Sequence, residues 1–522
     1  MQESVGRTVS PWLASVTLPT RLPLAGDTRC DVAVVGAGIA GLSVAYTLAR
    51  EGRRVVVIDD GAIGGGQSGR TTAHLSNAME DLYQEIARVH GEDGARLAAE
   101  SHAAAVDRIE QVAREEHIAC DFERLDGYLF AAPGHDREEL HRELEAARAA
   151  GVDVELVDRA PLATFDTGPA LRFARQAQFH VLKYLAGLAA AIERHGGAIH
   201  CDTRATAVEG GRPVRVTTTR GTITADAVVV ATNTPVVSRV LVHARQAAYQ
   251  TYVIGAEITP GSVPRALYWD TDDPYHYVRV HTLPATATGA AAEGTCDVLI
   301  VGGEDHKTGQ ADDAEVRWER LMVWAKRRFP TVERLAFRWS GEVMQPVDSI
   351  GLIGRNPNDA DNVFIVTGDT GMGMTHGTIA GILLPDLIAG RAHPWARLYD
   401  PSRIRLGAAR SFVAENANMA AQYTDWLTPG EVRSVDEIPA GCGAVMRRGV
   451  SKVAVYRDDA GGVHERSAVC PHLGCIVGWN HAERTWDCPC HGSRFDARGR
   501  VLNGPAMSDL AEARPEAERR AS

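Results

Sequence analysis

The pattern of apolar and polar positions divides the first half of the chain into buried strands and helices. Residues 32–35 and 55–58 are unbroken apolar runs, as expected for strands buried on both faces. Residues 94–117, 137–151 and 181–197 instead place apolar side chains three and four positions apart, opposite a charged face. Because that spacing follows the turn of an α-helix, the pattern predicts three amphipathic helices after the first strands.

The second half of the chain changes character twice. Between about 245 and 345 apolar and polar residues alternate, which predicts a strand-rich region. Residues 402–427 return to a helical period and are expected to form a connecting helix. After residue 428 short apolar segments are separated by Gly- and Asp-rich turns, so a small β domain is expected there.

Length and composition limit the classes of protein to consider. A chain of 522 residues is too long for one ordinary core, so two or three domains are expected. The net charge of −12 argues against nucleic acid or an anionic membrane as a partner. The polar start predicts no secretory signal, and the apolar stretch 379–390 is too short to span a bilayer. Five cysteines are scattered singly along the chain, which favours a cytoplasmic protein over one that is cross-linked by a set of disulfide bonds.

A glycine motif stands between the two buried strands, in the order strand, turn, helix, strand and acid. It comprises Gly36, Gly38, Ile39, Ala40 and Gly41. The first glycine permits a tight turn, the second lets the backbone approach a pyrophosphate, and the third lets helix and strand pack closely. Asp59, at the end of the second strand, can accept hydrogen bonds from a ribose diol. The order predicts a dinucleotide site, with a purely structural turn as the alternative.

Three further segments favour FAD over NAD, because a long and deeply enclosed cofactor needs backbone from distant parts of the chain. They are residues 61–76, 223–235 and 362–390. With these segments, the chain from about 28 to 400 resembles the D-amino-acid-oxidase-like (DAO) superfamily of FAD oxidoreductases. The resemblance implies an α/β fold in which an FAD-binding Rossmann-like domain is interleaved with an α+β substrate domain.

The same resemblance assigns residues to the cofactor. In that family a late glycine loop and its helix close over the flavin, and an earlier loop lies near the pyrophosphate. The late loop would be Gly371, Met372, Gly373, Met374 and Thr375, and the earlier one Ser68, Arg70, Thr71 and Thr72. Some members hold the flavin covalently through a histidine of the earlier loop. That position is Thr71 here, so we interpret His74, three residues later, as a packed or hydrogen-bonded residue.

Aromatic and polar side chains gather in the strand-rich region, which in the DAO family roofs the flavin and forms the substrate pocket. The pocket candidates are Tyr275, Tyr277, Arg279 and His306, beside Tyr268, Trp269, His276, Lys307 and Gln310. Any one of them could instead be ordinary packing or surface. The planar fork of Arg279 would suit a substrate carboxylate. The strand at 297–303 has no lysine where O2-using amine oxidases of the family often have one, which weakens the interpretation as an efficient oxidase.

Two short stretches, "CPHLGC" at 470–475 and "CPCHGS" at 488–493, hold four cysteines and two histidines. Their order resembles the Rieske [2Fe–2S] motif, Cys-x-His followed by Cys-x-x-His. The match implies cluster ligation by Cys470, His472, Cys488 and His491 and a disulfide between Cys475 and Cys490. A structural zinc site is the alternative, although zinc knuckles prefer Cys-x2-Cys pairs.

Two neighbouring features refine the Rieske match. Residues 503–506, "NGPA", fit the proline turn that covers such clusters. Ser493 stands where a hydroxyl donates to a bridging sulfide in high-potential clusters, but Phe495 replaces a tyrosine that donates to a ligand sulfur. The loss of one donor predicts an intermediate reduction potential.

The two halves together predict a flavin-dependent dehydrogenase. A small amine or amino acid would pass hydride to the flavin, and electrons would leave singly through the exposed edge of His472 and His491 to a one-electron acceptor. An H2O2-producing oxidase with a structural cluster and a non-catalytic redox sensor are the alternatives. No histidine follows Ser493, so a mononuclear-iron oxygenase site is not expected.

The expected organisation has four parts. They are an N-terminal extension (1–27), a DAO-like domain (28–400), a connecting helix (401–427) and an all-β Rieske domain (428–522). The FAD part of the second would take about 28–80, 200–240 and 345–400, and its substrate part about 81–199 and 241–344.

Overall fold

The structure is a computed structural model that describes residues 6–17, 20–132, 134, 137–237, 242–289 and 294–513. A six-stranded sheet forms the centre of its first part, in the order β18–β19–β12–β2–β3–β8. The strands are β2 (Val32–Val35), β3 (Val55–Ile58), β8 (Ala198–His200), β12 (Ala227–Val230), β18 (Leu352–Arg355) and β19 (Val363–Thr367). All neighbours run parallel except β18, which is antiparallel to β19.

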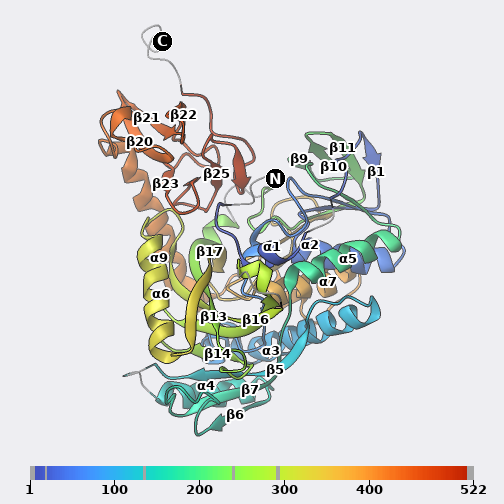
Figure 1. Cartoon of the computed structure of the whole chain (residues 1–522). Helices are drawn as coiled ribbons and strands as arrows, with labels where there is room; N and C mark the ends of the chain where they lie inside the picture. The colour runs from blue at the N-terminus through green and yellow to red at the C-terminus, as the bar shows by residue number, and fades with distance from the viewer. Residues whose placement is uncertain are drawn as a thin grey trace.

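Both faces of this sheet are covered, which explains the unbroken apolar runs. One face packs on helices α2 (Ile39–Arg50), α5 (Val181–Arg194) and α7 (Gly373–Ile388), through residues such as Val34 and Val57 (Figure 1). The other face, with Val35 and Ile58, packs on a four-stranded sheet. That sheet contains β1 (Thr28–Arg29), β11 (Gly221–Ala225), β10 (Val214–Thr218) and β9 (Ala205–Glu209).

A nine-stranded sheet forms the second layer, in the order β17–β13–β16–β15–β14–β5–β7–β4, with β6 also paired to β7. Its strands are β4 (His74–Leu75), β5 (Glu123–Phe130), β6 (Val154–Val157), β7 (Ala170–Gln178), β13 (Gln246–Ile258), β14 (Leu267–Asp270), β15 (His276–Pro284), β16 (Thr295–Lys307) and β17 (Val332–Pro346). The predicted helices are present as α3 (Tyr83–Glu115), α4 (Glu138–Ala149) and α5. Sequence reasoning missed α6 (Ala314–Arg328), which interrupts the strand-rich region and buries Trp318, Leu321 and Trp324 against the sheet.

The C-terminal part is an all-β unit that stands beside the two-layered part (Figure 1). It contains a three-stranded sheet, β20 (Cys442–Arg448), β21 (Ser451–Arg457) and β22 (Val463–Ser467). A four-stranded sheet follows, with β23 (Gly478–Asn480), β24 (Thr485–Asp487), β25 (Arg494–Asp496) and β26 (Val501–Asn503). The connecting helix is shorter than predicted, because α9 spans only Ala409–Ala421 and a 3₁₀ turn continues over Gln422–Leu427.

Candidate functional site

A cavity of about 1500 Å³ opens at the carboxyl ends of β2, β3 and β12. The glycine motif forms its edge with the geometry that each glycine was predicted to need. Gly36 has a φ of +109°, and a Cβ on Gly41 would lie 1.9 Å from the Gly36 carbonyl oxygen. A Cβ on Gly38 would lie 2.9 Å from Ser68 Oγ. Gly38 lines the cavity at the N-terminus of α2, where the backbone N–H groups favour a phosphate group.

Asp59 lies on the cavity wall directly after β3. Its Oδ2 accepts from the Ala37 backbone N–H at 2.7 Å, and its Oδ1 accepts from that of Gly61 at 2.8 Å. Burial and the charge of Asp60 raise the pKa of Asp59 to about 6. Each carboxylate oxygen has a further lone pair, so the group can also accept from a ribose hydroxyl.

The two loops assigned to FAD reach the same cavity from distant parts of the chain. The lining includes Ser68, Arg70, Thr71 and Thr72 from one loop and Gly371, Met372, Gly373, Met374 and Thr375 from the other. Ser68 Oγ accepts from the Ile39 N–H at 3.0 Å, which ties the first loop to the start of α2. The guanidinium of Arg70 points instead to Glu483 of the C-terminal unit, 3.0 Å away. These residues form a continuous cradle from Asp59 to the glycine loop, as an extended dinucleotide requires.

His74 lies beside the rings of Trp269 and Tyr277, with centroids 6.1 and 5.8 Å away. Its Nδ1 shares a hydrogen bond with Thr72 Oγ1 at 2.9 Å. Burial and the charge of Arg279 lower the pKa of His74 to about 3, so its ring is neutral. His74 thus packs as a neutral, hydrogen-bonded side chain on the cavity wall.

Two of the four pocket candidates line the cavity. Tyr275 and Tyr277 project into it with their ring centroids 5.5 Å apart, and Tyr277 Oη shares a 2.7 Å hydrogen bond with Thr251. The Tyr277 ring lies over Gly302, where a Cβ would come within 2.1 Å of it. Trp269 lines the same wall.

The other two candidates, Arg279 and His306, do not line the cavity, which corrects the prediction from the sequence. Arg279 is fully buried and donates to the Ala73 carbonyl at 2.6 Å and to His281 Nδ1 at 2.9 Å, so it lies behind the cavity wall. His306 stacks on Tyr252 and shares a 3.0 Å hydrogen bond with its hydroxyl. His306 follows Asp305 in β16, and successive side chains of a strand point to opposite faces. The cavity therefore receives Asp305 and not His306.

The other aromatic and polar residues named in the strand-rich region do not line the cavity, with the exception of Trp269. Tyr268 stacks on Tyr128 away from the cavity, and His276 is bonded to Asp270 and stacks on Trp324. Lys307 pairs with Glu415 at 2.6 Å, and Gln310 bonds to Asn418 at 2.8 Å, both on α9. These last two anchor the connecting helix rather than a substrate.

Sequence reasoning missed Glu80 and Asp305, two carboxyl groups on the cavity wall. Glu80 is hydrogen-bonded to Tyr275 and lies against the glycine loop. Burial, together with the charges of Asp81 and Asp305, raises the pKa of Glu80 well above its usual value. Burial raises that of Asp305 to about 6. Asp305 could have been noticed from the sequence, because it is an acidic residue within the predicted strand-rich region. Glu80 has no such signal, since only the folded chain brings it to the cavity wall.

The four proposed cluster ligands meet at the tips of two loops. The thiols of Cys470 and Cys488 are close enough to hydrogen-bond to each other, and the rings of His472 and His491 lie 4.9 Å apart. His491 Nδ1 is buried and has no hydrogen-bond partner in the described part of the chain. Two adjacent thiols and two adjacent imidazoles on neighbouring loops are the donor set that a Rieske [2Fe–2S] cluster needs, so these side chains fit that group.

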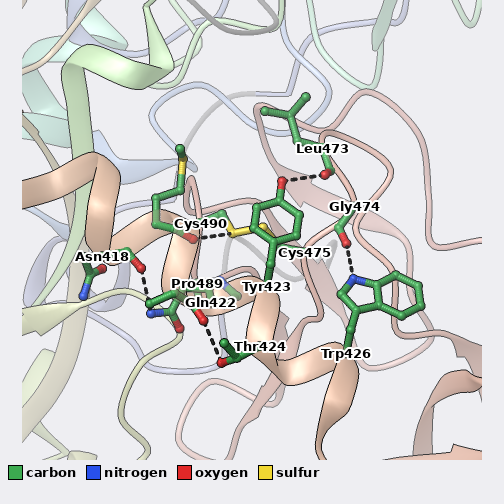
Figure 2. Close-up of a disulfide and its surroundings, with 12 residues drawn as sticks. Asn418, Gln422, Tyr423, Thr424, Trp426, Leu473, Gly474, Cys475, Pro489 and Cys490 are labelled. Atoms are coloured by element: carbon green, nitrogen blue, oxygen red, sulfur yellow. Dashed lines mark hydrogen bonds between the residues drawn. A yellow bond between two sulfur atoms is a disulfide. The ribbon is translucent and has the colours of Figure 1, made fainter. Parts of the chain in front are cut away.

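The disulfide implied by the Rieske resemblance, Cys475–Cys490, is present between the two loops (Figure 2). The segment after α9 covers it, since Tyr423 Oη donates to the Leu473 carbonyl at 2.8 Å and Trp426 Nε1 to that of Gly474 at 3.0 Å. Sulfurs of Cys475, Cys488 and Cys490 lie within 4.8 Å of one another. Because two of the three are joined in the disulfide, this group is not a zinc site.

The C-terminal unit also forms part of the FAD cavity. Residues from β25, β26 and the turn after them line it, namely Asp496, Arg500, Val501, Leu502, Asn503, Gly504, Ala506 and Met507. Asn503 Nδ2 donates to Glu342 Oε1 at 2.6 Å, and Arg494 donates to Gln250 Oε1 at 2.6 Å. The C-terminal unit therefore forms part of the wall of the cofactor site.

The histidine side of the cluster site faces the two-layered part, and of the exposed edge that the sequence predicted only His472 is partly exposed. His243 packs edge-on against His472 and His491, with centroid distances of 4.8 and 5.6 Å. His243 and His491 are almost fully buried. Sequence reasoning missed His243, and no local pattern marks it.

A family model of FAD-dependent oxidoreductases (DAO) matches residues 31–387, and a model of the Rieske [2Fe–2S] domain matches residues 428–514. The Rieske 2Fe-2S iron-sulfur protein YhfW of Bacillus subtilis is 31% identical over 509 residues, covering 96% of each chain. The gamma-glutamylputrescine oxidoreductase of Escherichia coli is 28% identical over 376 residues, covering 70% of this chain and 84% of that protein.

Among solved structures, glycine oxidase from Geobacillus kaustophilus superposes with a TM-score of 0.59 at 19% identity. The match covers 72% of this chain and 99% of that chain, which shows a shared fold. Within the described residues, the structure has no helix of the length and apolar character that crossing a bilayer requires.

Proposed function

Because the chain belongs to the family of FAD-dependent oxidoreductases and carries a Rieske [2Fe–2S] domain, we propose that it is a dehydrogenase for a small amine or amino acid whose electrons pass from flavin to cluster within one chain. One observation carries the proposal. The imidazoles of the cluster site pack on His243 of the flavin part, and the same C-terminal unit lines the flavin cavity. Bound FAD takes two electrons as hydride, whereas a Rieske cluster carries one at a time.

The cavity wall supplies the groups that amine oxidation needs. A substrate ammonium must first lose one proton, and Asp305, whose pKa burial raises to about 6, lies on the cavity wall where it can accept that proton. The neutral amine can then lose hydride from the carbon bearing nitrogen, and water converts the resulting iminium to a carbonyl compound and ammonia. Tyr275, Tyr277 and Trp269 line this part of the cavity.

The buried interface between the flavin part and the C-terminal unit supports electron transfer with the cluster domain held in one position, rather than transfer by a domain that moves. Arg70 and Glu483 form an ion pair across it with both side chains fully buried. Burial tends to raise the pKa of Glu483, but the charges of Arg70 and Arg494 outweigh it and hold that pKa below its usual value. Electrons would thus enter the cluster from its histidine side, and an acceptor would take them from another side.

The experiment that tests the route is a His491→Ala variant. Loss of this ligand is expected to empty the cluster site while FAD stays bound and substrate still bleaches the flavin under anaerobic conditions. Turnover with a one-electron acceptor should collapse. His464→Ala is the matched control, because His464 lies in the same domain but bonds to Asp458 instead.

Unchanged acceptor-linked turnover in His491→Ala, with cluster loss verified by EPR and iron analysis, would contradict the route and favour the H2O2-producing oxidase. In the wild type we expect one FAD and two irons per chain.

A further inference from the structure

The substrate end of the cavity carries the carboxyl groups of Glu80 and Asp305, and Asp369 also lines the cavity, beside Gly373 of the glycine loop. A Cβ added to Gly371 would lie 1.4 Å from Glu80 Oε2, so Glu80 is in contact with the loop that is proposed to lie along the flavin. Thr251 is hydrogen-bonded to Asp305, but Asp305 Oδ1 has no partner among the described residues. Burial raises the pKa of both carboxyl groups, and a bound cation would favour their ionised forms, so this end of the cavity is suited to a positive charge.

Aromatic rings form the rest of this wall. Trp269, Tyr275 and Tyr277 line the cavity around the two carboxyl groups. Glycines create the space for two of the rings, because a Cβ on Gly127 would lie 2.5 Å from the Trp269 ring and one on Gly302 would meet Tyr277. The face of an aromatic ring attracts cations, so these rings and the carboxyl groups favour the same kind of ligand.

The arginines that line the described cavity all lie away from this end, and no described lysine lines it. Arg204 and Arg500 lie near Asp60, beside the ribose end. Arg21 pairs with Glu193 and Arg70 with Glu483, and Arg7 belongs to the exposed N-terminal segment. Arg279, the predicted carboxylate anchor, is sealed behind the wall by the Ala73 and Phe179 carbonyls. A substrate carboxylate at this end would face Glu80 and Asp305 without a cation to pair with.

We propose that the substrate is a cationic alkylamine that has no carboxylate on the carbon bearing nitrogen, held by Glu80, Asp305 and the rings of Trp269, Tyr275 and Tyr277. The inference rests on the proposed function and narrows it, because it removes α-amino acids from the substrate class. Both carboxyl groups lie within a desolvated wall, where attraction of a cation and repulsion of an anion are stronger than in water.

The test is binding by matched pairs of compounds that differ only in the α-carboxylate. The pairs are ethylamine and alanine, 1-butylamine and norvaline, and pyrrolidine and proline. Each is titrated into the anaerobic holoenzyme, and the flavin absorbance change and the rise in Tm are recorded. We expect at least one amine to bind more tightly than its amino acid, by about tenfold or more.

Substitutions of Glu80 and Asp305 test whether these two residues cause the preference for amines. Glu80→Gln and Asp305→Asn should each weaken binding of the amine by about tenfold and leave the weak binding of the amino acid unchanged or improved. Glu304→Gln is the control, because Glu304 neighbours Asp305 in β16 but pairs with Arg320 outside the cavity. Equal or tighter binding of the amino acids overturns the inference, as does a failure of every amine to bind or an unchanged affinity in both variants.

The proposed function is assessed separately in the same samples. Light with a chemical donor reduces the flavin without substrate, and the cluster spectrum then reports whether electrons move on. Electron transfer without amine preference overturns only the substrate class, whereas amine binding without electron transfer overturns only the route.

Discussion

His243 packs edge-on against His472, with 4.8 Å between the two ring centroids. The first residue belongs to the flavin part and the second to a cluster loop, so this contact joins the flavin part to the C-terminal unit. His243 is 2% exposed, which means that solvent and partner proteins do not reach the cluster site through it. This contact is the one on which the proposed transfer of electrons from flavin to cluster rests.

The contact predicts the effect of truncating His243. His243→Ala should lower the free energy of unfolding by roughly 1–3 kcal/mol, because it leaves a cavity between buried rings. It should also slow reduction of the cluster by photoreduced flavin and shift the EPR spectrum of the cluster. His243→Phe preserves a ring at the contact and should retain most of the stability. An unchanged Tm and an unchanged rate of cluster reduction in His243→Ala would contradict this role.

The Arg70–Glu483 pair predicts an asymmetry between single and double substitutions. Either Arg70→Met or Glu483→Met leaves a buried charge without its partner, and should cost about 3–5 kcal/mol of unfolding free energy. The double variant removes both charges and should cost much less than the sum of the two. Denaturant unfolding of the three variants measures the difference. Additive effects would mean that the two side chains do not stabilise the interface as a pair.

The sequence predicted the parts of the fold that local pattern controls. The β2–α2–β3 unit follows from two apolar runs and three glycines, each of which has a neighbour that a Cβ would strike. The Cys475–Cys490 bond and the grouping of Cys470 with Cys488 were implied by the Rieske resemblance. In these places the information lies within about thirty consecutive residues.

The sequence could not predict which side of a strand faces the cavity, or what covers the cluster. Arg279 was a plausible anchor by its chemistry, but its guanidinium donates to carbonyls from segments about a hundred and two hundred positions away. Glu80 and His243 gain their roles only when distant loops meet. A one-residue difference in strand position separates Asp305, which lines the cavity, from His306, which does not.

The glycine motif predicts two kinds of failure. In Gly38→Ala the added Cβ meets only the tip of the Ser68 side chain, which can rotate, so FAD affinity should fall while the fold is retained. Gly38→Val should abolish FAD binding.

In Gly41→Ala the Cβ would meet the Gly36 carbonyl at 1.9 Å, and the backbone cannot yield there without separating α2 from β2. That variant should fail to fold or unfold at a much lower Tm. FAD retention after gel filtration and thermal unfolding distinguish the two results, and FAD retained in full by Gly38→Val would contradict the placement of the pyrophosphate.

Asp59 predicts a dependence of FAD binding on pH. Burial and the charge of Asp60 raise its pKa to about 6, above the ordinary value of 3.8. Since the folded-state pKa exceeds the unfolded one, Asp59 makes the FAD-free protein less stable as the pH rises from about 4 to 6.

A ribose diol donates hydrogen bonds to the ionised carboxylate, so FAD binding favours loss of that proton. The affinity for FAD should therefore rise with pH by up to about tenfold per unit below pH 6, and level off above it. Asp59→Asn cannot ionise, and should bind FAD more weakly with no such rise between pH 5 and 7. Fluorescence titration of the FAD-free protein with FAD at a series of pH values measures both profiles. A rise of the same size in Asp59→Asn would assign the proton to another group, and a flat wild-type profile would mean that Asp59 does not accept from the ribose.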